Sequence, residues 1–414
     1  MDTLITPQAS AGGQPFDQGT AYGRKIHAHD PLLTEVGPGT PMGELLRRYW
    51  QPVEASDRLQ DLPLRVRLLG EDLVLFRDGR GRAGLVVEHC AHRGTSLFYG
   101  RIEEDGIRCP YHGWKFDVQG HCIEQACEPG GGQHRAAGRQ PWYPVQERYG
   151  TVWAYMGPPD RKPVLPRWAP LDGLQDGETY VIRGAAYGPP EGLDFNWLQS
   201  YENIVDPLHA VWLHIMHSEE NQFGAEPGYQ PGLDTTAFIQ HTKWSDTDRG
   251  VRFEQVFPMG DGRGYHYSVE NILPNASIVP YPVTGALDNV IFHVPIDDTH
   301  WRAFVITRAK DPGEVEARGA KHRGKWWRDC TPEELQRYPG DYETQSTQGP
   351  ITVHAHEHLA QTDRGVVLTR RRLRQLVEDV RAGKDPLNVS FDPDAWLSSV
   401  AYAFVDAMGA GSER

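Results

Sequence analysis

The sequence lacks the features that direct a protein into or across a membrane. It contains no run of about 18 apolar residues, so no transmembrane helix is predicted. Its first stretch, MDTLITPQASAGGQPFDQGT, has an acid at position two and no apolar core, which argues against a signal peptide. Only five cysteines occur, and if two of them bind a metal, the odd remainder does not suggest a disulfide framework. We therefore expect a cytoplasmic protein.

The chain also lacks an excess of basic residues. Its 42 Lys and Arg stand against 56 Asp and Glu, which gives a formal net charge of −14. Nucleic-acid binding calls for a basic stripe, and anionic lipid surfaces attract clustered cations, so we expect neither partner. The 414 residues, of which 39% are hydrophobic, are enough for two or three domains with a sizeable core.

Two short motifs that combine cysteine with histidine stand out in CAHRGTSLFYGRIEEDGIRCPYHGW. Cys90 is followed by His92, and Cys109 is followed by His112, with sixteen residues between the pairs and a glycine after each. A [2Fe–2S] centre with two imidazoles on one iron and two thiolates on the other needs this mixture of ligands. The alternative is a zinc site, but the usual zinc motifs pair like with like, so we favour the cluster.

A second constellation follows roughly a hundred residues later, in YENIVDPLHAVWLHIMH. Asn203, Asp206, His209 and His214 have the spacing N-x2-D-x2-H-x4-H, and two imidazoles with a carboxylate suit Fe(II) and leave positions open for dioxygen. Residues five apart on an ideal helix differ by about 140° in direction. The two histidines can therefore face one metal only if Pro207, a distortion or a break turns the chain between them. The alternative is a pair of core histidines.

The pattern of strands and turns divides the chain into an arm and two domains. Residues 1–40 are predicted to form an irregular N-terminal arm that is ordered against a neighbouring subunit. In the domain 41–157, a helix is predicted at 42–50, before a small antiparallel barrel or sandwich. Its strands are predicted from the runs LRVRLL, DLVLF, LVVEH, WKFDV and TVWAYM. The proline-rich stretch GPPDRKPVLPRWAP marks the boundary to the domain 158–414.

The second domain is predicted to combine helices with one antiparallel sheet, which makes the fold class α+β. A helical stretch is expected at roughly 193–217, and an amphipathic helix is expected from Asp363 to Ala382, ended by Gly383. The predicted strands between them are VRFEQVF, YHYSVENILP, ASIVPYPV, NVIFHVPI and WRAFVITRAK.

With these two motifs in this order, the chain resembles the oxygenase component, or α subunit, of the Rieske non-haem iron oxygenases. The resemblance covers most of residues 40–382. The stretches GTPMGELLRRYWQPV and EHLAQTDRGVVLTRRRL are similar to the phthalate-dioxygenase-like members, which are built of α subunits only. It implies a small antiparallel Rieske [2Fe–2S] domain, a helix-grip-like catalytic domain with mononuclear Fe(II), and a homotrimer or stacked trimers.

The resemblance also implies roles for individual residues. Asp206 would bridge the mononuclear iron to a Rieske histidine of the adjacent subunit, and Asn203 would lie near the position of dioxygen. In PGDYETQSTQGPI, the third iron ligand is expected at Asp341, with Glu343 and Asp363 as the alternatives.

Two further groups of possible ligands receive a structural interpretation. Cys122 and Cys127 are expected to be small packing residues. The three histidines of the H-x-H-x-H sequence have no evident supporting shell, so they are expected to be structural or to line a substrate pocket: His354, His356 and His358.

The implied activity is the oxidation of an aromatic, carboxylated substrate by dioxygen, with electrons from NAD(P)H. A separate flavin and iron–sulfur reductase, with or without a ferredoxin, would deliver them. We favour monooxygenation such as O-demethylation; ring cis-dihydroxylation and aryl-ether cleavage are the alternatives. A more distant alternative is a Rieske electron carrier without catalytic activity. Arg183, Arg252 and Arg302 are candidates for holding the carboxylate.

Overall fold

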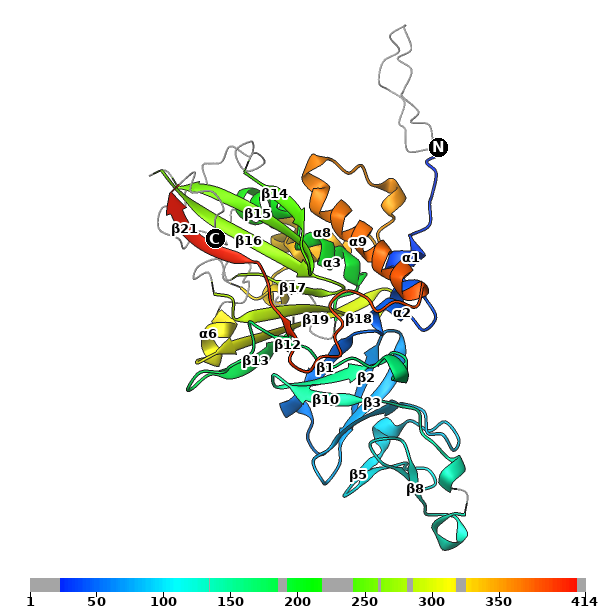
Figure 1. The fold of residues 1–414 in the computed structure, drawn as a ribbon. Coiled ribbons are helices and arrows are strands. Elements are labelled where there is room, and N and C mark those ends of the chain that lie inside the picture. The colour runs from blue at the N-terminus through cyan, green and yellow to red at the C-terminus, as the bar shows by residue number, and fades with distance from the viewer. Residues whose placement is uncertain are drawn as a thin grey trace.

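The computed structural model describes residues 23–133, 135–184, 192–217, 241–259, 262–280, 286–317 and 325–407. Residues 1–22 of the predicted arm lie outside this range. Strands from the first half of the chain build a smaller lobe, and a long sheet with helices on one face builds a larger one (Figure 1). None of the helices in the described ranges is long and apolar enough to cross a membrane.

The smaller lobe consists of short antiparallel strands. Their bounds are Trp50–Ala55 (β1), Leu64–Leu68 (β2), Glu71–Arg77 (β3), Ala83–Val87 (β4), Arg101–Glu103 (β5), Gly106–Arg108 (β6), Trp114–Phe116 (β7), Cys122–Gln125 (β8), Trp142–Tyr143 (β9), Val145–Arg148 (β10) and Thr151–Tyr155 (β11). They pair in the orders β1-β11-β10, β2-β3-β4-β9 and β5-β6-β7-β8. Each of the five predicted strand runs contributes a strand, and the sheet β5–β8 lies at the far end of the lobe (Figure 1).

The helix predicted at 42–50 is shorter in the structure. It spans Pro41–Leu46 (α2), with the Thr40 side chain accepting from Gly43 N at its start. Strand β1 already begins at Trp50, and its partner is β11. Helical propensity is overridden here because every residue of β1 is buried in the sheet, so the amphipathic pattern continues into a buried strand.

The larger lobe is organised around one antiparallel sheet, as predicted. Its strands are Thr179–Arg183 (β13), Lys243–Asp246 (β14), Gly250–Met259 (β15), Arg263–Ile272 (β16), Ala276–Ile278 (β17), Asn289–Asp297 (β18), His300–Ala309 (β19) and Tyr402–Ala407 (β21). The order is β13-β19-β18-β17-β16-β15-β14, with β21 also paired to β16. The sequence did not predict β13, β14 and β21, and the end of the predicted strand ASIVPYPV lies outside the described residues. A short parallel pair, Arg167–Trp168 (β12) with Trp396–Leu397 (β20), ties the tail to the linker.

Helices cover one face of this sheet (Figure 1). The remaining α-helices are Pro31–Thr34 (α1), Trp197–Asn203 (α3), Pro207–Val211 (α4), Pro312–Ala317 (α6), Pro332–Arg337 (α7), Asp341–Ser346 (α8) and Arg364–Arg381 (α9). The predicted helix from Asp363 to Ala382 is confirmed as α9, and its apolar stripe is buried. The described part of the N-terminal arm contacts its own chain, since Asp30 pairs with Arg374 of α9 and Val36 N donates to Asp298 Oδ1 at 2.8 Å.

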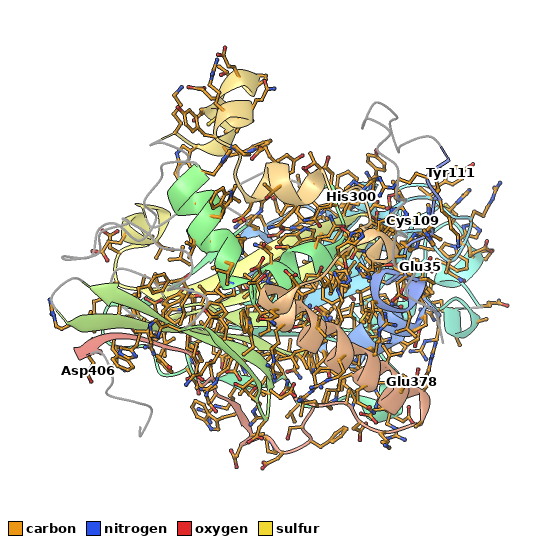
Figure 2. The ribbon with its side chains drawn as sticks, turned by 90° about the horizontal axis from the view of Figure 1, so that it is seen from above. Glu35, Cys109, Tyr111, His300, Glu378 and Asp406 are labelled. Carbon is orange, nitrogen blue, oxygen red and sulfur yellow. The ribbon has the colours of Figure 1, made fainter. Side chains whose placement is uncertain are left out.

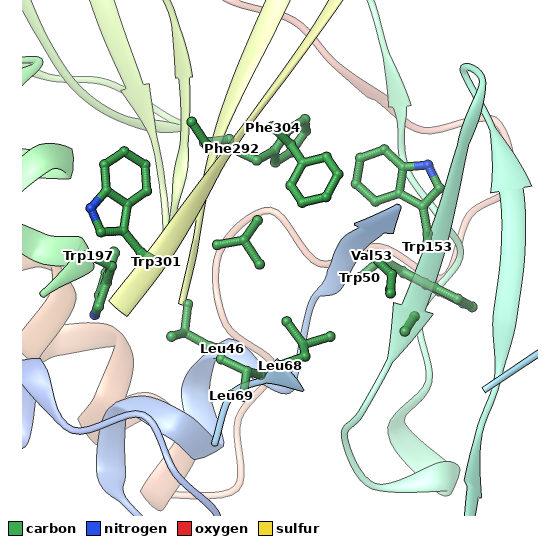
Figure 3. Close-up of a cluster of buried hydrophobic side chains, with 14 of the residues drawn as sticks. Leu46, Trp50, Val53, Leu68, Leu69, Trp153, Trp197, Phe292, Trp301 and Phe304 are labelled. Carbon is green, nitrogen blue, oxygen red and sulfur yellow. The ribbon is translucent and has the colours of Figure 1, made fainter. Parts of the chain in front are cut away.

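A hydrophobic core runs between the two lobes (Figure 3). Trp153 of β11 packs edge-on against Phe292 of β18, with ring centroids 5.1 Å apart. Leu46 and Leu68 from the first half of the chain belong to the same cluster. Because apolar burial is the main favourable term in folding, this shared core fixes the lobes relative to each other. The boundary between domains 41–157 and 158–414 stays a prediction.

Candidate metal centres

Two loops of the smaller lobe present the Cys/His motifs. The first follows β4, and the second joins β6 to β7; Cys90 and Cys109 are each only 3% exposed. Both loops contain the same turn, because Gly94 N donates to Cys90 O (2.8 Å) and Gly113 N donates to Cys109 O (3.1 Å). The two glycines have φ of 74° and 69°, a left-handed conformation that favours glycine. Each motif therefore depends on the glycine that follows it.

The two imidazoles lie beside each other, with ring centroids of His92 and His112 4.7 Å apart. Trp114 stacks flat on His92, at 4.5 Å and 3° between the planes. The Nδ1 atom of His112 is buried and has no hydrogen-bond partner among the described residues. A buried polar atom without a partner is costly, and coordination to a metal would satisfy it. Burial, together with the nearby His112, lowers the pKa of His92, which favours the neutral ring that binds metals.

The two thiols of this centre interact with each other. The hydrogen bond from Cys90 lowers the pKa of Cys109 to about 6, and backbone N–H groups of Tyr111 and His112 act in the same direction. The same hydrogen bond to Cys109, together with burial, raises the pKa of Cys90, and the backbone N–H groups of His92 and Arg93 only partly oppose this. Thiolates are the form that binds iron, and hydrogen bonds to the sulfurs are a feature of iron–sulfur sites. The four residues therefore offer two cysteine sulfurs and two imidazoles, the donor set of a Rieske cluster.

Sequence reasoning missed the residue that anchors the first loop. Gln140 is 1% exposed; its Oε1 accepts from Ala91 N at 2.7 Å, and its Nε2 donates to Val87 O and His89 O at 2.7 and 2.9 Å. Nothing in the sequence distinguishes this glutamine, which lies far from the motif. At the other side of the loops, Tyr111 is exposed, and Figure 2 shows it with Cys109 at the end of the molecule opposite Asp406.

The second candidate centre lies where the predicted helix 193–217 is broken. Helix α3 ends at Asn203, and Asp206 Oδ1 then caps α4 by accepting from Leu208 N at 3.1 Å. After α4, the chain continues as a π-helical turn, Trp212–His217. Hydrogen bonds in a π-helix connect residues five apart, which brings such residues to one side. His209 lies in α4 and His214 lies in the π-helical turn that follows it, and their rings face each other with centroids 5.5 Å apart.

Asp341, the first residue of α8, meets these two histidines. Its Oδ1 is 3.4 Å from His214 Nε2 and 3.6 Å from His209 Nε2, and the three ligand atoms lie within 4.8 Å of one another. The alternatives are engaged elsewhere. Glu343 accepts from Gly340 N and Trp327 Nε1, and Asp363 accepts from Ala360 N.

The surrounding contacts orient these groups for a metal. His209 Nδ1 lies against the backbone oxygen of Asp206, which fixes the proton on Nδ1 and leaves Nε2 for coordination. Asn203 Nδ2 lies 3.1 Å from His209 Nε2 and 3.4 Å from Asp341 Oδ1. Burial alone would raise the pKa of Asp341, but the rings of His214 and His209 and the Asn203 amide outweigh it and hold that pKa well below its usual range. A carboxylate with two imidazoles is the donor set of non-haem Fe(II) oxygenases.

A third group of possible metal ligands surrounds an arginine side chain. Glu202, His354 and Glu357 lie within metal-ligating distance of one another. The guanidinium of Arg370 pairs with both carboxylates, so this cluster is a buried ion-pair network. His356 Nε2 accepts from the backbone N–H of His27 at 3.3 Å, a structural role for the H-x-H-x-H sequence. Of the two extra cysteines, Cys122 is buried among apolar side chains and Cys127 is exposed.

The smaller lobe presents a Rieske-type set of ligands, and the larger lobe presents two histidines and a carboxylate. Together these two sets define an iron-dependent oxygenase with two metal centres. The family model of the Rieske [2Fe-2S] domain matches residues 49–136.

Three curated relatives match over most of this chain. It is 45% identical to phenoxybenzoate dioxygenase subunit alpha of Ectopseudomonas oleovorans, over 90% of this chain and 91% of that protein. It is 38% identical to the tert-butanol monooxygenase / tert-amyl alcohol desaturase oxygenase subunit of Aquincola tertiaricarbonis, over 92% of this chain and 84% of that protein. It is 34% identical to the 5,5'-dehydrodivanillate O-demethylase oxygenase subunit of Sphingobium sp. (strain NBRC 103272 / SYK-6), over 87% of this chain and 82% of that protein. The chain belongs to this family, the oxygenase subunits of the Rieske oxygenases.

The fold agrees with solved members. The crystal structure of dicamba monooxygenase bound to dicamba aligns with a TM-score of 0.57 at 17% identity, covering 82% of this chain and 99% of that one. The cofactors of the family are the [2Fe–2S] cluster and mononuclear iron. The predicted fold class and enzyme class are thereby confirmed.

Proposed function

We propose that this chain is the oxygenase component of a multicomponent system that oxidises an aromatic carboxylate bearing an ether group. Cys90, His92, Cys109 and His112 would hold the cluster; His209, His214 and Asp341 would hold Fe(II). The observation that carries the proposal is the approach of His209 from α4 and His214 from the π-helical turn to the Asp341 carboxylate. A non-catalytic electron carrier has no need for this arrangement. When bound, the cluster supplies electrons singly and the Fe(II) supplies the position where dioxygen is reduced.

The residues of this chain have separate tasks in the proposal. Asp206 holds the tautomer of His209 through its backbone oxygen. Its carboxylate, with Oδ2 3.9 Å from His209 Nδ1, would link that ring to a cluster-binding histidine of the adjacent subunit. Asn203 donates toward the open side of the triad. The aromatic cluster next to α4, which includes Phe253 and Tyr267, supplies an apolar wall for an aromatic ring.

The proposal includes a second copy of the chain. The cluster loops lie at the far end of the smaller lobe, whereas α3 and α8 lie on the large sheet (Figure 1). Exposed Tyr111, beside His112, is suited to contact another subunit. The cluster of one subunit would thus serve the iron of its neighbour in a homotrimer or stacked trimers. Electrons would come from NAD(P)H through a separate reductase.

The ether and the carboxylate are inferred from the names of the relatives. Phenoxybenzoate dioxygenase and 5,5'-dehydrodivanillate O-demethylase share such a substrate class. Arg252 is a poor candidate for holding the carboxylate, because it points away from the face that carries Phe253 and pairs with Glu254 at 3.0 Å. Arg183 and Arg302 line a cavity whose lining includes none of the three proposed iron ligands.

A single-turnover experiment tests the proposal. The anaerobically reduced protein is mixed with methoxybenzoates, phenoxybenzoates or plain benzoate, then with 18O-labelled dioxygen, and the products are identified by mass spectrometry. Formaldehyde with a phenol from a methoxybenzoate is the favoured result and establishes O-demethylation. The second candidate is ring dioxygenation with ether cleavage, favoured by the 45% identical relative; it would give doubly labelled products from phenoxybenzoates.

Two controls separate the parts of the proposal. His209→Ala is expected to abolish turnover while leaving the visible absorption of the cluster intact. Oxidation of the reduced cluster by dioxygen without a labelled product from any ether acid would refute the substrate assignment. If His209→Ala turned over normally, the iron site itself would be misassigned.

A further inference from the structure

Helices α3 and α8 are joined by two amide side chains that lie one turn apart. Asn203 and Gln199 are four residues apart on α3 and therefore share a face. Asn203 contacts Asp341 at the first residue of α8, and Gln199 Nε2 donates to Gln345 O at 2.8 Å. Gln345 lies four residues after Asp341, so the two contacts hold the same face of α8 at both ends.

Both the nitrogen and the oxygen of the Gln199 amide bind backbone groups at the end of α8 and just after it. Besides Gln345 O, its Nε2 donates to Gly349 O at 3.2 Å, and its Oε1 accepts from Thr352 N at 3.1 Å. The Gln199 side chain is only 4% exposed, so water has little access to the backbone groups that the amide binds. Removing the amide would leave buried backbone groups unpaired, which is unfavourable.

Helix α8 is too short to hold its own position. It has six residues, and isolated helices below about 12 residues are marginal in water. Glu343 supports its first turn through Gly340 N and Trp327 Nε1, but neither contact involves α3. Tyr342 of α8 donates at 2.7 Å to Oδ1 of Asp194, a residue that lies before α3. Among the described residues, the hydrogen bonds that join α8 to α3 itself are those of the two amides, which set Asp341 relative to the histidines that follow α3.

We propose that Gln199 is a positioning residue for the mononuclear iron: it fixes α8 against α3 and so sets the distance from Asp341 to His209 and His214. The inference rests on the iron site of the proposed function. Loss of a residue that orients a metal ligand typically weakens metal binding by about 10–100-fold. We expect a loss of that size although Gln199 touches neither the metal nor the substrate.

The test compares Gln199→Met with Gln375→Met in the full-length protein with its cluster assembled. Methionine keeps the length and packing of the side chain and removes the hydrogen bonds. Gln375 is an exposed residue of α9 whose amide donates to Asp379 Oδ1 and, among the described residues, joins no second helix, which makes it a suitable control. The measurements are Fe(II) affinity of the iron-depleted mononuclear site, the electron paramagnetic resonance spectrum of its nitric oxide adduct, and the melting temperature.

We expect Gln199→Met to bind Fe(II) roughly 10–100-fold more weakly and to change the spectrum of the nitric oxide adduct, with Gln375→Met unchanged. A lower melting temperature with unaltered iron affinity and spectrum would overturn the proposal, because the residue would then be merely structural. If the methionine variant does not fold, Gln199→Glu serves instead, since it keeps the acceptor for Thr352 N but opposes a carboxylate to Gln345 O. Unchanged Fe(II) affinity in His209→Ala would instead refute the iron site itself.

Discussion

The two loop glycines of the Rieske-type centre allow a sharp test of why the loops need them. Gly94 and Gly113 occupy equivalent turns with nearly the same positive φ. They differ in surroundings: a Cβ on Gly94 would meet nothing within 4 Å, whereas a Cβ on Gly113 would lie 2.8 Å from Ala126 Cβ. Alanine at Gly94 therefore probes backbone strain alone, and alanine at Gly113 probes strain together with a steric clash.

The expected magnitudes follow from these two terms. A non-glycine residue in the left-handed region costs roughly 1–2 kcal/mol. Crowding a packed site costs about 1–3 kcal/mol more. Gly113→Ala should therefore destabilise the cluster-bound lobe roughly twice as much as Gly94→Ala. The double variant Gly113→Ala/Ala126→Gly should recover the difference, because it removes the opposing methyl group.

The assay follows the visible absorption of the cluster during heating at a fixed rate, for the parent protein and the variants. Ala126→Gly alone is the control, and as an exposed position it should shift the midpoint only slightly. Equal midpoints for Gly94→Ala and Gly113→Ala would refute the steric term. A double variant no better than Gly113→Ala would show that Ala126 is not the obstacle.

Three further predictions concern a buried core histidine and two residues next to the candidate ligands. His293 is buried, and burial lowers its pKa to about 3. The unfolded chain binds a proton below pH 6.5 that the folded protein does not, so the free energy of unfolding decreases as the pH falls below 6.5. His293→Gln should remove about 1 kcal/mol of that decrease between pH 6 and 5 in unfolding experiments, and the same pH dependence in the variant and the parent would contradict this. Asp206→Asn should keep both metals and the cap on α4, since asparagine caps equally well, yet stop product formation in single turnover, whereas Asp206→Ala should also cost about 1 kcal/mol of stability. Gln140→Leu should strip support from the first loop and lower the iron and sulfide content of the purified protein, which chemical analysis would reveal; full cluster retention would contradict that role.

The sequence predicted the strands better than the breaks between helices. The alternating run LRVRLL became β2, which buries one face, and the run NVIFHVPI became β18, which is buried on both faces at its centre. Both patterns are local properties of the sequence. The helix 193–217 was predicted as one stretch, although the five-residue spacing of His209 and His214 already required a distortion between them. The structure provides it as a cap at Asp206 and a π-helical turn. The type of distortion is set by packing that the local pattern does not encode.

The choice of the third iron ligand shows the same limit. The family resemblance favoured Asp341, but Glu343 and Asp363 stayed open as alternatives because each is an acid in the same part of the chain. The structure separates them because Glu343 and Asp363 each accept backbone N–H groups of their own helix starts, while Asp341 turns toward the two histidines. Such a choice depends on contacts between segments more than a hundred residues apart, which spacing along the chain does not contain.

Both candidate centres rely on the same physical device, and it explains why motif matching captures only part of each. The ligands lie on turns and on helices of five and six residues, which have too few hydrogen bonds of their own to hold a metal geometry. In each centre, a buried glutamine from another segment binds backbone groups of the ligand-bearing stretch: Gln140 for the first loop and Gln199 for α8. An amide can do this because it offers donors and an acceptor at once, so it satisfies groups that would otherwise be buried unpaired. Since any segment that packs nearby can supply the amide, its position is fixed by the fold and not by the motif. Substitutions at these two glutamines should therefore affect metal retention as strongly as substitutions one residue away from a ligand.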